Sequence, residues 1–228
     1  MQEKHLPVIQ IIQLSCKNNN LWYQNLPLAR LKYNKDVDIF QNWHIFAYGI
    51  DEIINNTVHR MKKTTLEAIG KENPFQLIGK DWMLVTAGSE FGYNTMTASW
   101  GGVGWLWNKP VAFIFIRPER YTHDFLETNE RVTLSFYAEE YRQALQICGT
   151  KSGRDINKTA ETGLVPVVLE SGSMTFEQAR LTLDCRKLFK TSTHESDFVE
   201  KSILNTWYGE KAGLHDIYVV EIENVYTE

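Results

Sequence analysis

Cysteine is scarce in this sequence, and its positions suggest no pairing. Only three of the 228 residues are cysteine, Cys16, Cys148 and Cys185, and no CxxC pair occurs. We therefore expect neither a disulfide framework nor a zinc site, and the composition is typical of a reducing cytoplasm. Cys148 and Cys185 are expected to pack as small apolar side chains, with a redox role as the alternative.

The sequence also lacks long hydrophobic runs and a strong excess of one charge. No apolar run approaches the ~18 residues of a membrane span, and Gln10 and Gln13 interrupt the apolar patch at 8–14. A secretory signal would need a longer apolar core and small residues before a cleavage site. The formal net charge of −4 gives no sign of a nucleic-acid or polybasic membrane partner. We expect a cytoplasmic protein that binds neither nucleic acid nor membrane.

Several familiar catalytic motifs are missing as well. The sequence has no G-x-S-x-G elbow, no H-E-x-x-H, no P-loop and no G-x-G-x-x-G that opens a helix after a strand. The six histidines are scattered without metal-ligand spacing, so each is interpreted as a surface or core residue. We therefore predict no metal site and no catalytic side-chain acid or base.

What is present is a chain rich enough in apolar residues to fold. Hydrophobic residues make up 43% and aromatic residues 12% of the sequence, as in globular proteins. The character changes near residue 60, where an Asn- and aromatic-rich segment gives way to MKKTTLEAIGKENPF. Residues 61–228 are predicted to form the domain. Residues 1–60 are either an extension that packs on it or sequence upstream of a natural start at Met61.

The domain is predicted to consist mainly of strands with inserted helices. GSEFG at 88–92 indicates a hairpin turn between two strands, and PVAFIFIR at 110–117 is apolar enough to be buried on both faces. Gly149 is expected to cap a helix. Many short strands with hairpin turns favour an antiparallel barrel. The strands are expected at 81–87, 93–100, 110–117, 131–137, 164–170, 179–189 and 216–226, and the helices at 119–129, 138–148 and 195–207.

One predicted strand carries an unusual row of small polar groups. Because side chains alternate along a strand, Thr95, Thr97 and Ser99 share one face, while Asn94 and Met96 share the other with Ala98. A half-buried strand would instead alternate apolar and polar residues. The row therefore indicates a binding surface, with a polar barrel strand solvated on one face as the alternative.

Two further segments are typical of anion sites. In RPERYT, Arg117 ends an apolar strand, and Tyr121 and Thr122 enter the first turn of a helix, whose free N–H groups favour a phosphate. KSGRDINK adds Ser152, Gly153, Arg154 and Lys158 in a loop that contains glycine. These segments stand beside a Trp-rich loop at 100–107. Together they indicate a phosphorylated aromatic ligand.

The order and spacing of these segments carry a family resemblance. NTMTASWGGVGWLWNKPVAFIFIRPERYTHDFLE, then GTKSGRDINK, then FEQARLTLDCRKLF resemble the flavin reductase-like family, in the branch that includes flavoredoxin. The resemblance implies an FMN-binding split β-barrel of Greek-key-like antiparallel strands that forms a homodimer. It also implies FMN near the subunit interface, with electrons supplied by reduced nicotinamide nucleotides or partner proteins.

The resemblance also assigns residues to the cofactor. Arg117, Tyr121 and Thr122 would hold the phosphate, and Ser152 and Lys158 would close over it. Asn157 departs from the acidic residue expected there. Trp105 and Trp107 are predicted to serve core or dimer packing rather than flavin stacking. The residues expected along the isoalloxazine ring and ribityl chain are Asn94, Thr95, Met96, Thr97, Ala98, Ser99 and Trp100.

The resulting hypothesis is an FMN-dependent oxidoreductase that passes electrons from NAD(P)H through bound flavin to free flavin or a partner protein. Because the cofactor carries the redox chemistry, no catalytic side chain is required. A flavoredoxin-type electron carrier without enzymatic turnover, or a flavin-binding relative that has lost turnover, would need the same residues. The sequence leaves these alternatives open.

Overall fold

The computed structural model describes residues 61–209 and 213–228, which lie within one compact unit of the chain. The hypotheses for residues 1–60 concern a segment outside the described residues. No helix in the described part has the length and apolar character needed to cross a membrane.

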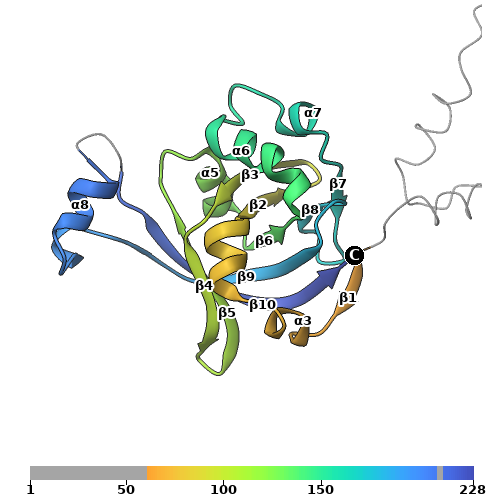
Figure 1. The fold of residues 1–228 in the computed structure, drawn as a ribbon, viewed down its shortest axis with the longest axis horizontal. Coiled ribbons are helices and arrows are strands. Elements are labelled where there is room, and N and C mark those ends of the chain that lie inside the picture. Colours follow the sequence, from red (N-terminus) through yellow and green to blue (C-terminus); the bar gives the residue numbers. More distant parts are fainter. Residues whose placement is uncertain (1–60, 210–212) are drawn as a thin grey trace, which may run out of the picture. The chain divides into compact units, whose positions relative to one another are not determined.

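A curled antiparallel sheet is the centre of the described fold (Figure 1). A short strand β1, Lys62–Thr64, joins it by pairing with β10. Outside this sheet, β7 (Pro166–Val168) pairs with β8 (Met174–Phe176). The order across the main sheet is β3 (Gly92–Ala98), β2 (Met83–Ser89), β6 (Arg131–Phe136), β9 (Leu181–Ser192), β10 (Asp216–Thr227), β5 (Lys109–Ile116) and β4 (Gly101–Leu106).

The two ends of this strand order meet at one corner. β3 and β4 lie at opposite ends of the sheet, yet only Ser99 and Trp100 separate them in the chain. Three Cα–Cα steps span at most ~11 Å, so the sheet must curl until its edges approach each other there. No hydrogen-bonded pairing between β3 and β4 closes the barrel within the described residues. The predicted split barrel is therefore confirmed, and its opening lies at this corner.

Three helices gather beside β2 and β3 (Figure 1). These are α5 (Tyr121–Thr128), α6 (Arg142–Thr150, which follows the 3₁₀ turn η2, Glu139–Tyr141) and α7 (Lys158–Thr162). Short helical turns α3 (Glu67–Gly70), α4 (Pro74–Gln76) and η1 (Leu77–Asp81) lead into β2. The predicted helices at 119–129 and 138–148 are thus confirmed.

The barrel core follows from the two-residue period of its strands. In β5, Ala112, Ile114 and Ile116 are fully buried on the inner face; on the outer face Val111 is fully buried, and Phe113 and Phe115 are half-buried. The prediction of burial on both faces therefore holds fully for the inner face and in part for the outer face. The glycines of β4 explain why β5 carries large apolar residues on its outer face. Gly102 and Gly104 have no side chains, so the ring of Phe113 can lie against them.

The segment at 100–107, predicted as a loop, is the edge strand β4. Trp107 and Asn108 have φ of 52° and 57° and form the two-residue turn to β5, in which positive φ at both positions matches the twist of a hairpin. Trp105 is 66% exposed and Trp107 56% exposed, so the packing of these two rings in the core is excluded. The sequence did not predict this strand, because its glycines have no side chains and therefore show no alternation of apolar and polar residues.

Two helix predictions also need correction. Gly149 lies inside α6 rather than capping it, because a Cβ there would come within 3.2 Å of the Cβ of Thr97, so glycine lets the helix approach β3. The helix predicted at 195–207 is broken into the 3₁₀ turn η3 (Glu195–Asp197) and α8 (Ser202–Trp207). A capping box fixes the start of η3, because the side chain of Asp197 accepts a hydrogen bond from the N–H of His194. β8 was not predicted.

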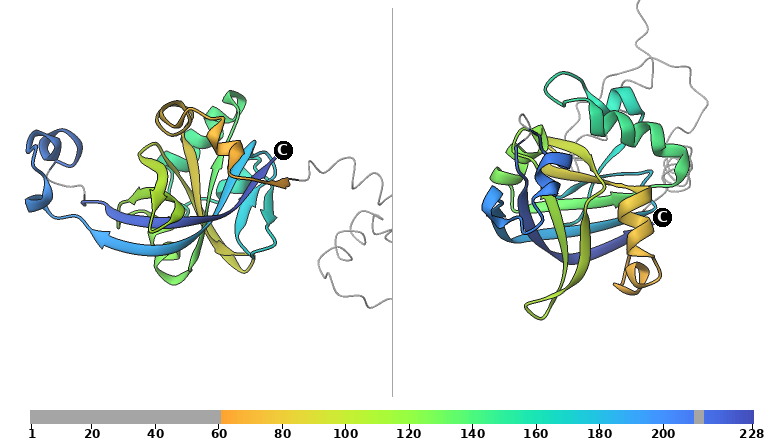
Figure 2. Two further views of the ribbon diagram at one scale, coloured as in Figure 1. Left: turned by 90° about the horizontal axis from the view of Figure 1, so that it is seen from below. Right: turned by 60° about the vertical axis from the view of Figure 1, so that its left-hand side comes forward.

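The described residues 193–209, here called the arm, connect β9 to β10. Figure 2 shows the arm extending from the barrel at the end of these two strands. Its aromatic residues pack on the corner between β3 and β4: the ring centroids of Trp207 and Trp100 are 5.4 Å apart, and those of Tyr208 and His215 are 5.4 Å apart. The arm therefore adds one wall to that corner.

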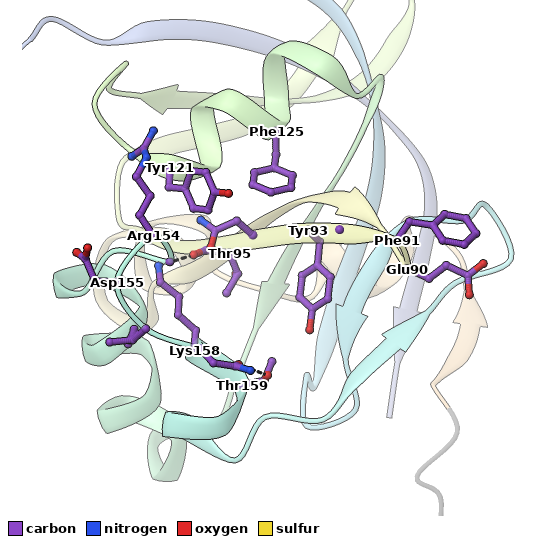
Figure 3. A pocket seen from close by; sticks show the side chains of 15 residues that line it. Glu90, Phe91, Tyr93, Thr95, Tyr121, Phe125, Arg154, Asp155, Lys158 and Thr159 are labelled. Atoms are coloured by element: carbon purple, nitrogen blue, oxygen red, sulfur yellow. Dashed lines mark hydrogen bonds between the residues drawn. The ribbon is translucent and has the colours of Figure 1, made fainter. Parts of the chain in front are cut away.

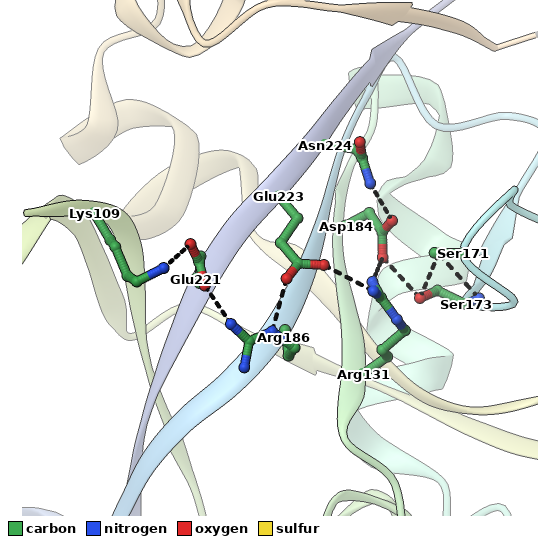
Figure 4. Close-up of polar contacts among 9 residues, drawn as sticks. All are labelled: Lys109, Arg131, Ser171, Ser173, Asp184, Arg186, Glu221, Glu223 and Asn224. Atoms are coloured by element: carbon green, nitrogen blue, oxygen red, sulfur yellow. Dashed lines mark hydrogen bonds and ion pairs between the residues drawn. The ribbon is translucent and has the colours of Figure 1, made fainter.

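A ladder of ion pairs crosses the outer face of β5, β10, β9 and β6 (Figure 4). Glu221 accepts from Lys109 at 2.5 Å and from Arg186 at 2.7 Å. Glu223 accepts from Arg186 at 2.7 Å and from Arg131 at 2.8 Å. Asp184, 3.6 Å from Arg131, is the third carboxylate, so three carboxylates balance the three cations, and the ladder holds strands together with no net charge for a ligand.

Candidate functional site

Three cavities share residues around the open corner of the barrel. The edge groove, of about 320 Å³, lies along the end of β3 and is bordered by Met96–Trp100, Phe115, Arg117, Glu119, Arg120 and His215. The α5 pocket, of about 110 Å³, lies at the start of α5 and shares Met96, Glu119 and Arg120 with that groove. The edge groove and the α5 pocket are therefore adjoining parts of one site.

A third cavity, the outer pocket of about 610 Å³, adjoins the α5 pocket. The two share Asn94, Tyr121, Gly153 and Lys158. Each of the twelve predicted cofactor residues lines at least one of the three cavities, so the fold brings them all together. They divide as follows: Met96, Thr97, Ala98, Ser99, Trp100 and Arg117 line the edge groove; Asn94, Met96, Tyr121, Thr122, Ser152 and Lys158 line the α5 pocket; and Thr95 lines the outer pocket with Asn94, Tyr121 and Lys158.

The hydroxyl row on β3 is largely engaged within the protein. Thr95 Oγ1 bonds with Thr86 Oγ1 at 2.9 Å, and Thr97 Oγ1 donates to the carbonyl of Leu145 on α6. Their common face is therefore turned toward neighbouring elements, as alternation requires. The polar groups of this strand that remain to face the edge groove are Ser99 and the backbone of β3.

The first turn of α5 presents unused N–H groups to the α5 pocket. Its N-cap, Arg120, makes no side-chain capping hydrogen bond. Asn94 holds the turn in place by donating from Nδ2 to the Oγ1 of the fully buried Thr122 at 2.8 Å. An uncapped helix start favours an anion, because its free N–H groups and the helix dipole point at the same place.

Two cations face this helix start without a carboxylate partner in the described part of the chain. Lys158 is 6% exposed, and its Nζ donates to the carbonyls of Thr95 at 2.6 Å and Cys148 at 2.9 Å. Burial lowers the pKa of Lys158 to about 8, and Arg120 contributes to the lowering. Burial and the neighbouring charge of Arg117 likewise lower the pKa of Arg120. A buried positive charge of this kind is best balanced by a bound anion.

Arg120 was not among the predicted residues. The sequence RPERYT offers two arginines, and its first, Arg117, was chosen because it ends the apolar strand. In the structure Arg117 lines the edge groove, while Arg120 lines both the groove and the α5 pocket. Arg117 donates to the carbonyl of Trp207 at 2.9 Å and lies over the ring of Tyr208. Its role toward a phosphate stays a prediction.

Gly153 shapes the loop on the other side of the α5 pocket. A Cβ at this position would stand 2.0 Å from Oδ1 of Asn94, so only glycine allows the loop to come this close to β3. Ser152 sits beside it and accepts from the N–H of Arg154 at 3.2 Å. Asn157 caps α7 by accepting from the N–H of Ala160 at 3.2 Å, which gives this departure from the family pattern a structural role.

His215, interpreted from sequence as a structural histidine, lines the edge groove. Its Nδ1 is 2.9 Å from the hydroxyl of Tyr208, and its ring centroid is 5.2 Å from that of Trp100. Burial, reinforced by the charge of Arg117, lowers the pKa of His215 to about 4. The imidazole is therefore neutral at pH 7. The sequence did not indicate this position at the groove, because His215 follows the arm alone and belongs to no motif.

The two described cysteines pack as predicted. Cys148 and Cys185 are both free and fully buried. Burial raises the pKa of Cys148 to about 11, and burial raises the pKa of Cys185 as well. Both thiols are therefore protonated at neutral pH, which makes them poor nucleophiles.

A flavin mononucleotide suits this arrangement. The α5 pocket has the donors that a phosphate needs: an uncapped helix start, the two cations Arg120 and Lys158, which outnumber the one carboxylate, Glu119, that lines the pocket, and the hydroxyl of Ser152. The adjoining edge groove offers Met96, Ala98 and Trp100 to a flat aromatic ring, with neutral His215 and cationic Arg117 at its border. An anionic group joined to a planar ring would satisfy both cavities at once.

The strand order and this open corner define a split-barrel protein. The chain matches the family described as "Flavin reductase like domain" over residues 76–228. It therefore belongs to the flavin reductase-like family, and the resemblance seen in the sequence is confirmed. A comparison with curated proteins finds no match.

Solved structures share the fold. An FMN-binding protein from Thermus thermophilus with bound p-hydroxybenzaldehyde has a TM-score of 0.51 and 20% identity, covering 64% of this chain and 71% of that chain. Flavoredoxin from Methanosarcina acetivorans has a TM-score of 0.52 and 17% identity, covering 65% and 68%. Flavoredoxin of Desulfovibrio vulgaris (Miyazaki F) has a TM-score of 0.51 and 18% identity, covering 73% and 77%. At these identities the likeness concerns the fold.

Proposed function

We propose that this protein is an FMN-binding oxidoreductase. The observation that carries the proposal is the pair of cations, Arg120 and Lys158, that meets an uncapped helix start beside an apolar groove at the barrel's open corner. Thr122, Ser152 and the first N–H groups of α5 would bind the phosphate with them. The ring would lie along the end of β3.

The bound flavin would supply the redox chemistry, accepting electrons from NADH or NADPH and passing them to free flavin or a partner protein. The chain's own task is to bind and orient it. Met96 and Ala98 give the groove an apolar floor, and Trp100 and the arm border it. Neutral His215 and the guanidinium of Arg117 offer hydrogen-bond donors, and the charges of Arg117 and Arg120 offset the Glu119 carboxylate that borders the same groove.

The visible spectrum provides the first test. We expect the purified protein to be yellow, or to bind added FMN, and to bleach at catalytic speed when NADH or NADPH is added without oxygen. A colourless protein that does not quench the fluorescence of added FMN would overturn the proposal. The nucleotide that bleaches faster identifies the donor.

A flavoredoxin-type electron carrier is the second candidate. It is favoured by the likeness to two flavoredoxins, whose fold is the same. A carrier would hold FMN equally well, but it would be inert to both nicotinamide nucleotides and would exchange electrons only with a redox protein. The same anaerobic titration therefore separates the carrier from the reductase.

We further propose a cytoplasmic homodimer. Trp105 and Trp107 project as exposed rings from the β4–β5 hairpin, and clustered apolar surface of this kind usually marks an interface. Free buried cysteines and a nicotinamide electron donor both fit the cytoplasm. Light scattering after size exclusion should give twice the mass of one chain, and a monomer that still binds FMN would refute the dimer.

A further inference from the structure

A fourth cavity, here called the arm cavity, lies between the arm and the corner of the barrel. Its volume of about 400 Å³ falls within the ~300–1,000 Å³ common for small-molecule sites. It is lined by Trp100 and Phe115 of the barrel and by Ile203, Trp207 and Tyr208 of the arm. The FMN of the proposed site would occupy the α5 pocket and the edge groove, and it would leave this cavity open.

The aromatic walls of the arm cavity are held in place by contacts between rings. The planes of Trp207 and Trp100 meet at 87°, with their ring centroids 5.4 Å apart. Tyr208 packs edge-on against Phe198 at 5.6 Å, and its hydroxyl lies 2.9 Å from Nδ1 of His215. Trp100 and Trp207 are nevertheless 38% and 56% exposed. Exposed aromatic faces that are already ordered suit a planar ligand, because binding buries a large apolar area with little further loss of side-chain freedom.

The lining of the arm cavity is uncharged, and this separates it from the outer pocket. None of the five described side chains that line the arm cavity carries a charge. The outer pocket, by contrast, is lined by Glu90, Arg154, Asp155 and Lys158 (Figure 3). A phosphate placed among the rings of the arm cavity would lose water without gaining an ionic partner from this lining, which is costly. The arm cavity therefore suits an uncharged molecule and not a nucleotide.

Arg117 stands where the arm cavity meets the edge groove. It lines the edge groove, donates to the carbonyl of Trp207 at 2.9 Å and lies over the ring of Tyr208, 5.4 Å from its centroid. This is its one hydrogen bond within the described residues, and it uses one of five N–H donors. The other donors suit the carbonyl oxygen of a neutral ligand. Glu119, in the same groove, offsets the charge that would otherwise favour a carboxylate.

The arm cavity also adjoins the place proposed for the flavin ring. It shares Trp100 and Phe115 with the edge groove. A planar molecule in the arm cavity would therefore lie against the same side chains as the isoalloxazine ring. Among uncharged planar molecules, a quinone has carbonyl oxygens that Arg117 can bond, and it accepts two electrons.

We propose that the arm cavity binds an uncharged quinone as the electron acceptor. The inference rests on the proposed function and deepens it by naming the acceptor class. In the balanced reaction, NAD(P)H and one proton from water convert the quinone into its hydroquinone. The hydride, which carries two electrons and one proton, and the proton from water supply the hydrogens on the two oxygens. NAD(P)⁺ is released, and the flavin is unchanged at the end of the cycle.

Binding is tested with 2,3-dimethyl-1,4-naphthoquinone, whose methyl groups block the ring positions that would alkylate a thiol. The quinone is titrated into the full flavin-free chain and into the FMN-loaded chain, and quenching of tryptophan fluorescence is followed. We expect saturable binding to both, about tenfold or more tighter than that of 2-naphthoate, a bicyclic ring with a carboxylate.

Three results would overturn the proposal. One is no saturable binding of the quinone, as expected if a second copy of the chain covers the cavity. Another is binding to the flavin-free chain only, which would place the quinone in the edge groove. The third is tighter binding of 2-naphthoate, which would contradict the uncharged class.

Two variants localise the quinone. Trp207→Leu removes an aromatic face, and Ile203→Glu places a carboxylate in the cavity at a side chain that is 39% exposed. By calorimetry each should lower quinone affinity about fivefold or more, and more than it lowers FMN affinity. Ile203→Leu, which keeps the position apolar, is the matched control and should bind the quinone as the parent does. Equal losses of quinone and FMN in both variants would contradict the assignment.

The reduction step is tested without oxygen in the FMN-loaded chain after reduction with one equivalent of dithionite. The return of the yellow absorbance on addition of the quinone measures the step. Its rate should saturate in the parent, and Ile203→Glu should need about fivefold or more quinone for half-saturation. A rate that rises linearly and equally in parent and variant would overturn the inference and leave the proposed function intact. A chain that binds no FMN would defeat the proposed function itself, and the inference with it.

Discussion

Positive charge without a local counterion is the most informative residue-scale feature of this corner. Many cations of the described surface have carboxylate partners, as in the ladder of Lys109, Arg186 and Arg131. Arg120 and Lys158 instead make no ion pair in the described residues, and burial together with the charge of Arg120 lowers the pKa of Lys158. Such an arrangement costs stability unless an anion is bound, so binding and these two residues should be tightly coupled.

The first prediction compares the two arginines of RPERYT. Arg120→Gln should weaken FMN binding by about 10- to 100-fold, because a hydrogen bond to a charged group contributes roughly 1.5–3 kcal/mol. Riboflavin, which lacks the phosphate, should bind the variant and the parent almost equally. Fluorescence titration with both flavins provides the measurement.

Arg117→Gln is the comparison for that experiment. Since Arg117 lines the edge groove and not the α5 pocket, its loss should discriminate less between FMN and riboflavin. If Arg117→Gln causes the larger selective loss of FMN, the phosphate lies nearer Arg117 and the assignment to Arg120 is wrong.

The second prediction concerns pH and Lys158. The ammonium must be protonated to attract a phosphate, and in the flavin-free protein its pKa is about 8. FMN affinity should therefore be constant up to about pH 8 and fall above it, until the pKa of the complex, raised by the phosphate, is passed. Riboflavin affinity should not follow this profile. Titrations between pH 7 and pH 9 measure it.

Lys158→Met is the control for the pH profile. It should bind FMN weakly at every pH in this range and show no loss specific to alkaline pH. The lysine has a lower pKa in the folded chain than its ordinary 10.5, so the unfolded chain binds more protons between pH 8 and 10.5. The flavin-free parent should therefore gain stability across that window relative to the variant. A parent and variant with identical pH profiles would exclude a titrating lysine.

Among the elements, the edge strand β4 depends on one glycine. Gly101 has a φ of +152°, and a Cβ there would lie 2.5 Å from the carbonyl oxygen of Phe113. Gly101→Ala should therefore destabilise the fold by roughly 1–3 kcal/mol, which lowers Tm by several degrees in a domain of this size. Differential scanning calorimetry measures it.

Its neighbour Gly102 supplies the matched control. A Cβ at Gly102 would meet only the ring of Phe113, at an ordinary 3.9 Å. Gly102→Ala should therefore change Tm less than Gly101→Ala. Similar losses in both variants would mean that general loss of glycine in the strand, and not the conformation of Gly101, determines stability.

The sequence predicted those elements whose signal is local. β6 and β10 alternate or carry β-branched residues, and the turn before β3 is marked by glycine, so the strands and their hairpin were found. β4 was missed because its glycines are chosen for contact with Phe113 on another strand. Gly149 was misassigned for the same reason, since Thr97 of β3 explains it.

The residues of the candidate site also fall into those that the sequence could identify and those that it could not. β3 and the RPERYT and KSGRDINK segments could be recognised, and the fold brings their residues together. Arg120 and His215 could not be ranked, because their importance depends on burial and on neighbours distant in sequence. His215 contacts Tyr208 of the arm and Trp100 at the corner, and sequence spacing does not reveal these neighbours.

At the scale of the whole molecule, the described residues from Met61 onward contain the core and the three cavities. We therefore predict that a chain truncated to begin at Met61 folds and binds FMN as tightly as the full chain. β1 is kept in this truncation, and with it the pairing of Lys62 with Thr227. Circular dichroism and FMN titration of the two proteins make the comparison. Insolubility, or loss of FMN binding, would show that residues 1–60 are required.

The place of β10 in the strand order also sets when the barrel can form during synthesis. β10 pairs with β9, β5 and β1, so each of these three strands lacks this pairing partner until residues 216–227 have left the ribosome. Until then Ala112 and Ile114 of β5 have no neighbour on one side, and the nascent chain carries an open, apolar strand edge prone to aggregation. Barrel closure is therefore a late event on the ribosome, and ribosomes that stall between residues 117 and 215 should hold a chain that chaperones bind.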